Sequence, residues 1–219
     1  LAMPATLKAF YLDMQDDDFH TAIALYHQRF STNTFPAWPL GQPFRMVAHN
    51  GEINTVRGNR NWLASREELF ESDIWGDDVD LLKDLTSDNE SDSASLDHAL
   101  ELLALSGRSI EHSMCMLVPP AFINDKDISE ELQGFYKYHS SFSEPWDGPA
   151  GLVYTDGTKL CASLDRNGLR PSRYVLTEDG LLYIGSEVGA IQVDETSVVA
   201  KGRLGPGQML LADLSKGTL

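Results

Sequence analysis

The chain has 219 residues, 42% of them hydrophobic, which suits one globular domain or a large part of one. Its formal net charge of −16 repels nucleic acid and anionic lipid, and no apolar run reaches the roughly 20 residues of a membrane helix, so we expect no nucleic-acid and no membrane partner. Two cysteines are too few for a disulfide scaffold and favour a reducing compartment such as the cytoplasm.

The first third of the chain predicts short extended elements. The apolar run at 8–12 predicts a strand, and residues 21–30 predict another that leads into the polar stretch 31–34. Prolines then interrupt regular structure. Because Leu1 is not an initiator methionine and an apolar run follows so soon, we expect an N-terminal part of the domain to lie outside this sequence.

The middle of the chain predicts one strand and then helices. Residues 45–49 predict a strand that stops at Asn50-Gly51, a dipeptide that readily adopts positive φ. Apolar residues recur at helical spacing after Asn54, and again at 96–103 behind a polar start at 91–93. Most carboxylates of the acidic stretch before this second helix are expected in solvated loops.

The remaining third predicts antiparallel strands. Residues 114–118 predict a buried strand, and residues 128–136 predict a short helix. Strand-like runs flank Asp156-Gly157 and Asp179-Gly180, which predicts two hairpins, and residues 208–212 predict a further strand. Strands, then helices, then hairpins indicate an α+β fold.

Asn50-Gly51 is the first candidate site. A side-chain amide followed by a backbone N–H at a sharp turn can form the donor pair of an oxyanion hole, and loss of one such donor costs about 2.7–4 kcal/mol of transition-state stabilisation. Taken alone, the dipeptide is far more typical of an ordinary turn than of an oxyanion hole.

Other polar residues have both a structural and a functional interpretation. Arg29 could grip a carboxylate or form a structural ion pair. Asp92 could cap a helix or accept a substrate ammonium. His27 and His49 are candidate acid–base groups, but no partner spacing supports that role over hydrogen bonding or core packing.

The cysteines and the charged loop late in the chain give weaker signals. Cys115 and Cys161 lie in apolar runs without a neighbouring base, so they are interpreted as core residues and not as nucleophiles. The loop 165–171 could contact an anionic ligand, or its aspartate and arginines could pair with one another.

Five segments together carry a resemblance that none carries alone. They are HQRFSTNTFP (27–36), AHNGEINT with RGNR (48–60), SDSASLD (91–97), LDRNGLRPSRY (164–174) and GRLGPGQM (202–209). In this order they closely resemble the glutamine amidotransferase domain of the glutamate synthase large subunit, over nearly the whole chain.

The resemblance implies an N-terminal-nucleophile fold, in which two antiparallel sheets stack as an αββα sandwich flanked by helices; residues 1–219 would be the C-terminal portion of one such domain. It also implies a reaction. An N-terminal cysteine attacks the side-chain amide of L-glutamine, ammonia leaves, and water releases glutamate. No residue of this sequence matches that cysteine.

The resemblance assigns roles to five residues. Asn50 (side chain) and Gly51 (backbone N–H) match the oxyanion hole, Arg29 matches the ligand of the substrate carboxylate, and Asp92 matches the ligand of its ammonium. Thr32 lies where the family has a hydroxyl that contacts substrate.

The resemblance also implies partners and cofactors. Ammonia would pass to a downstream synthase domain of the same polypeptide, which converts 2-oxoglutarate to glutamate. No cofactor is expected in this chain, whereas FMN and an iron–sulfur cluster are expected in the rest of the parent enzyme, with ferredoxin or a small electron-donating subunit as partner. The location would be the cytoplasm, or a plastid in a photosynthetic eukaryote. A non-catalytic glutamine- or amino-acid-binding module and a class II amidotransferase with another acceptor are the alternatives.

Overall fold

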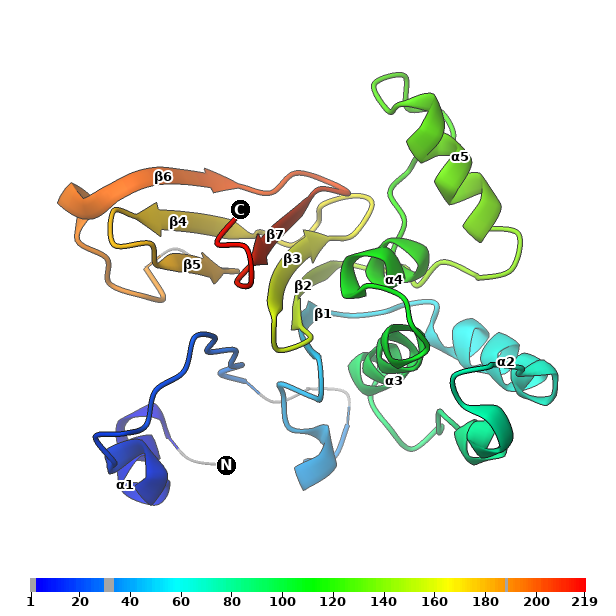
Figure 1. Ribbon diagram of the computed structural model, residues 1–219, viewed down its shortest axis with the longest axis horizontal. Coiled ribbons are helices and arrows are strands. Elements are labelled where there is room, and N and C mark those ends of the chain that lie inside the picture. Colours follow the sequence, from blue (N-terminus) through cyan, green and yellow to red (C-terminus); the bar gives the residue numbers. More distant parts are fainter. Residues whose placement is uncertain (1–2, 30–33, 188) are drawn as a thin grey trace.

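The computed structural model describes residues 3–29, 34–187 and 189–219, which form two antiparallel sheets and a group of helices (Figure 1). One sheet has the strand order β1-β2-β3-β7 and the other the order β5-β4-β6. The strands are β1 (Val47–Gly51), β2 (Ala150–Thr155), β3 (Lys159–Leu164), β4 (Arg173–Thr177), β5 (Leu182–Gly185), β6 (Val198–Arg203) and β7 (Met209–Asp213). The α-helices are α1 (Leu7–Phe10), α2 (Val56–Arg66), α3 (Asp92–Leu105), α4 (Ile110–Leu117) and α5 (Glu130–His139).

The main core lies between the four-stranded sheet and helices α3 and α4. Strand β2 alternates buried and half-buried residues, so that Leu152 and Tyr154 point into this core. Helix α3 contributes Leu96 and Leu100, and helix α4 contributes Met114. In Figure 1 helices α2 to α5 lie on one side of this sheet, and the three-stranded sheet lies on the other side. The α+β class predicted from the sequence is therefore confirmed.

The elements with strong local signals form as predicted. Ser91 accepts a hydrogen bond from the N–H of Ala94 (3.1 Å), which starts α3 as an N-cap. Asp156 accepts the N–H of Lys159 (2.8 Å) and fixes the β2–β3 hairpin. The second hairpin, β4–β5, and the strand β7 also form.

Several predictions for short apolar runs were wrong. Residues 8–12 contain the end of α1 and the start of a 3₁₀ turn instead of a strand, and residues 21–29 contain no strand. The predicted strand at 114–118 is the end of α4, because Ser109 caps a helix there by accepting the N–H of His112 (3.4 Å). Strand β6 was not predicted.

Strand β1 is an edge strand, and this placement positions the candidate site. It pairs with β2 from Val47↔Tyr154 to Gly51↔Ala150, and no strand of the described residues pairs with its other edge. Its C-terminal end therefore presents unpaired backbone groups beside the second sheet.

Candidate functional site

The candidate site lies at the C-terminal end of β1, where only glycine fits. Gly51 has φ +149°, and a Cβ at this position would overlap the carbonyl oxygen of Pro149. Across from it, Gly148 has φ +152°, and a Cβ there would overlap the carbonyl oxygen of Glu52. Two backbone segments thus pass closer together than side chains would allow, and this fixes the exit of the chain from β1.

Alternate N–H groups of β1 point away from the sheet. Glu52 donates its N–H to the carbonyl of Pro149 (2.9 Å), which makes Gly51↔Ala150 a non-hydrogen-bonded pair of the ladder. The N–H groups of Val47, His49 and Gly51 therefore face the open edge.

Side chains cap two of these three outward N–H groups. Val47 donates to the carboxylate of Asp97 (2.8 Å), and His49 donates to the side-chain oxygen of Gln42 (2.6 Å). The described residues supply no such acceptor for Gly51. An uncapped N–H at the end of a capped edge is a free donor, as the prediction of an oxyanion hole requires.

The side chain of Asn50 is held by the second sheet. Its Nδ2 donates to Oγ of Ser186 (3.1 Å), which follows the end of β5. This bond uses one amide proton and leaves the other for a ligand. Sequence reasoning missed Ser186, because nothing in the sequence places residue 186 next to residue 50.

Asp92 lies next to this donor pair. Its Oδ2 accepts the N–H of Ile53 (2.6 Å), two residues after Gly51, and its Oδ1 accepts the N–H of Ser93 (2.8 Å). The helix cap is Ser91, so Asp92 is not the N-cap but an acid in the first turn of α3, where the helix dipole favours negative charge. The structure thus brings Asp92 together with Asn50 and Gly51.

His49 lies beneath the site and is neutral near pH 7. Only 2% of its surface is exposed, and its Nδ1 forms a hydrogen bond of 2.7 Å with Oγ of Ser93. Burial lowers the pKa of His49 from 6.5 to about 4, against the opposing effect of Asp92, and the positive charges of His27 and Arg170 lower it further. The interpretation as a core histidine is therefore favoured over an acid–base role.

Arg29, which the sequence offered as a carboxylate ligand or a member of a structural ion pair, forms no ion pair among the described residues. It is exposed, and its N–H donates to Nδ1 of His27 (3.1 Å). His27, two residues before Arg29, is among the groups whose charge lowers the pKa of His49. Thr32, the other predicted contact in this segment, lies outside the described residues.

Arg170 is a cation near the site, and it belongs to the loop 165–171, for which contact with an anionic ligand was one of two alternatives. Its Cβ is 3.5 Å from the place of a Cβ on Gly151, which pairs with Asn50, and its Nε is buried without a hydrogen-bond partner among the described residues. The pairing of aspartate and arginine within this loop was a wrong alternative. Asp165 instead accepts the backbone N–H of Ala150 (2.9 Å), and Arg166 pairs with Asp147, outside the loop.

Neither cysteine is activated. Burial raises the pKa of Cys115, and it raises the pKa of Cys161 to about 12, so both thiols are protonated near neutral pH. Among residues 3–29, 34–187 and 189–219, no group of three or more His, Cys, Asp or Glu side chains could hold a metal ion, and no helix is long and apolar enough to span a membrane.

Comparisons with known proteins agree on one family. The model of the class II glutamine amidotransferases matches residues 1–219. The chain is 52% identical over 212 residues to the ferredoxin-dependent glutamate synthase of Pyropia yezoensis, covering 96% of this chain and 14% of that protein. It is 47% identical over 219 residues to the glutamate synthase [NADPH] large chain of Bacillus subtilis (strain 168), covering 100% of this chain and 14% of that protein.

Among solved structures, the chain is similar to the glutamine phosphoribosylpyrophosphate amidotransferase from B. subtilis complexed with ADP and GMP. The TM-score is 0.43 at 19% identity, over 85% of this chain and 32% of that one.

The chain spans about a seventh of the length of the glutamate synthases that it matches. It belongs to the class II glutamine amidotransferase family.

Proposed function

We propose that this chain forms the glutamine site of a glutamate synthase and stabilises the oxyanion that forms when the amide of L-glutamine is attacked. The free N–H of Gly51, beside the held amide of Asn50, carries this proposal. Both donors are fixed before substrate arrives, so little reorganisation opposes transition-state binding.

The same end of β1 offers partners for the charged groups of glutamine. The carboxylate of Asp92 would accept the α-ammonium while it keeps its bond to the N–H of Ile53. Arg29 would bind the α-carboxylate after its exposed side chain turns toward the site, and Thr32 would add a hydroxyl.

The attacking thiol would come from an N-terminal cysteine outside this chain. Its sulfur adds to the amide carbon, ammonia leaves, and water hydrolyses the thioester to glutamate. The raised pKa values of Cys115 and Cys161 support this, because a protonated thiol is a poor nucleophile. One alternative is a glutamine-binding module that catalyses no reaction. Asn50, Gly51 and Asp92 would bind glutamine equally well in such a module.

Ammonia would pass to a synthase domain of the same polypeptide, which converts 2-oxoglutarate to glutamate with electrons from ferredoxin or a reduced nicotinamide. The enzyme would work in the cytoplasm or in a plastid. An iron–sulfur cluster is commonly held by four cysteines, and this chain has two, both protonated, so its residues do not fit the cluster. We therefore propose that the cluster and FMN are held elsewhere in the parent enzyme.

Turnover of glutamine by the full-length protein tests the proposal. Asn50→Ala should lower the kcat for glutamine hydrolysis by about 10²–10³-fold, as the loss of one oxyanion donor does. Asn124→Ala, in a loop away from this site, is the matched control and should leave kcat unchanged. Glutamine binding without hydrolysis by the wild-type protein would favour the binding module, and a wild-type rate for Asn50→Ala would exclude the proposed donor.

A further inference from the structure

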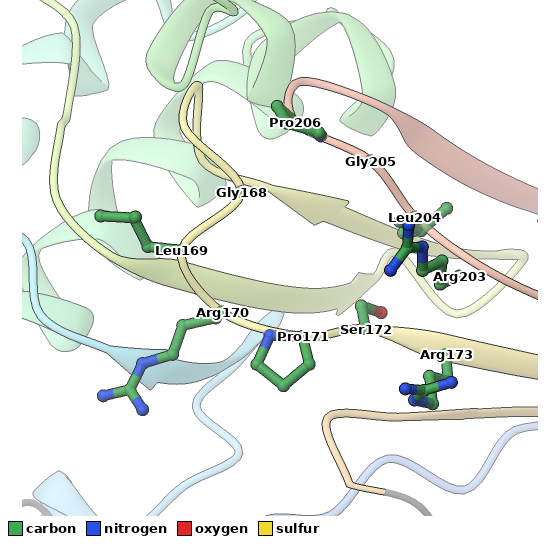
Figure 2. Close-up of a pocket in the computed structure, with 10 residues that line it drawn as sticks. All are labelled: Gly168, Leu169, Arg170, Pro171, Ser172, Arg173, Arg203, Leu204, Gly205 and Pro206. Carbon is green, nitrogen blue, oxygen red and sulfur yellow. The ribbon is translucent and has the colours of Figure 1, made fainter.

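A cavity of about 430 Å³ opens between the loop before β4 and the loop after β6 (Figure 2). Its lining contains three arginines, Arg170, Arg173 and Arg203, together with Ser172, and no carboxylate. We propose that this arginine cavity binds a small polyvalent oxyanion that carries phosphate or carboxylate groups, with Arg173 and Arg203 as its anchors.

The two anchors lie opposite each other on neighbouring strands. Arg173 of β4 is in register with Arg203 of β6. The N–H of Leu204 donates to the carbonyl of Ser172 (2.9 Å), which makes this a non-hydrogen-bonded pair, the kind in which facing side chains come closest. Like charges directly opposite each other destabilise a sheet. An anion held between them would turn this repulsion into attraction.

Neither anchor has a carboxylate partner within the described residues. Four other arginines do: Arg45, Arg60, Arg66 and Arg166. The chain has 33 acidic residues against 17 basic ones, so partners are plentiful. The charge of both anchors is therefore available to a ligand.

The walls of the arginine cavity are fixed by contacts between the two loops. The N–H of Gly207 donates to the carbonyl of Asp165 (3.2 Å). Gly168 packs so closely on Pro206 that a Cβ there would lie 2.9 Å from its ring. The carboxylate of Asp165 accepts the N–H of Asn167 (2.9 Å) and thus shapes the loop instead of neutralising the cavity. A preformed cavity loses little entropy when a ligand binds.

The chemistry of the anchors limits the ligand. A guanidinium offers a planar fork that matches the oxygens of a phosphate or a carboxylate, and two forks favour a ligand with at least two negative charges. In Figure 2 Arg173 and Arg203 lie on one side of the loop and Arg170 extends to the other side. The volume lies within the range of small-molecule sites, roughly 300–1,000 Å³.

Calorimetric titration of the full-length protein at low ionic strength tests the proposal, with inorganic phosphate in one arm and succinate, a dicarboxylate, in the other. We expect saturable binding in at least one arm, and the stronger arm identifies the ligand class. Arg173→Gln and Arg203→Gln should each weaken that binding by about tenfold or more, because each removes a charged hydrogen-bonding partner. The readout involves no turnover, so it does not depend on the proposed glutaminase activity.

Arg57→Gln is the matched control, since Arg57 is exposed on α2 and has no ion pair among the described residues. It should bind the anion as the wild-type protein does, and far-ultraviolet circular dichroism should show both anchor variants folded. The proposal is overturned if neither anion saturates the wild-type protein, or if the control loses as much affinity as the anchor variants.

Discussion

The two ends of strand β1 differ in how their outward backbone groups are treated. At the start, the carboxylate of Asp97 accepts the N–H groups of Arg45, Met46 and Val47, and so stands in for a neighbouring strand. At the end, the N–H of Gly51 has no such substitute in the described chain. A protein normally caps or covers an exposed edge. The uncapped donor at Gly51 is therefore the feature on which the proposed glutamine site rests.

Gly51→Ala disrupts the C-terminal end of β1, where the N–H is uncapped, and we expect it to have the largest effect on stability and on activity. The new Cβ would overlap the carbonyl of Pro149 at a φ of +149°, so β1 and the chain before β2 must separate. The free energy of unfolding should fall by at least about 4 kcal/mol, and glutamine hydrolysis should be lost. Urea unfolding measures the first effect.

Gly157→Ala is the control for this substitution. Gly157 also has positive φ (+90°), but a Cβ there meets nothing within 4 Å. Its cost should be the backbone strain alone, about 1–2 kcal/mol. Equal losses in the two variants would show that crowding at Gly51 is unimportant.

Asp97→Ala breaks the capped end. It leaves three buried or half-buried N–H groups without their acceptor, so the free energy of unfolding should fall by about 3 kcal/mol. Glu101→Ala, one turn further along α3, removes only the partner of the exposed Arg45 and should cost less than about 1 kcal/mol. A smaller loss for Asp97→Ala than for Glu101→Ala would contradict the capping role.

The pH dependence of the free energy of unfolding tests the middle of β1, because His49 lies between the two ends of this strand. Its folded pKa of about 4 is below the unfolded value of 6.5, so between these values the unfolded chain binds more protons. Stability from this group is therefore complete above pH 6.5 and is lost as the pH falls toward 4, by about 3 kcal/mol. The curve for His49→Gln should be flatter in this window, and two parallel curves would refute the assignment.

Ser186→Ala should have the smallest effect. It removes the partner that holds the Asn50 amide, so kcat for glutamine should fall by roughly tenfold, the value of one hydrogen bond, while KM changes little. Ser186→Thr keeps a hydroxyl and should recover most of the rate. If KM rises in place of a fall in kcat, Ser186 acts on substrate binding and not on the donor.

The parts of the fold that could be predicted are those set by residues close to one another in the sequence. The two Asp-Gly hairpins and the start of α3 depend on residues that are close in sequence, and these predictions are confirmed. The run at 114–118 is short and apolar, so periodicity cannot separate a buried strand from a helix. Strand β6 was missed because most of its residues are exposed and it includes Lys201, Gly202 and Arg203.

The site was predictable in part. Asn50, Gly51 and Asp92 carry motif signals, and the structure places them together. Ser186 follows β5 and reaches Asn50 only across the two sheets, so no local pattern in the sequence points to it. Arg170 belongs to the charged loop that the sequence singled out, but its approach to β1 is a tertiary contact that the sequence did not show. The roles assigned to all of these residues stay predictions until the variants are measured.

The hydrogen bond between Asn50 and Ser186 also links the site to both sheets of the fold. One partner belongs to the four-stranded sheet and the other follows β5 of the three-stranded sheet. A chain in which one sheet has formed without the other would carry Asn50 with a freely rotating amide. The position of the Asn50 amide therefore depends on both sheets being formed.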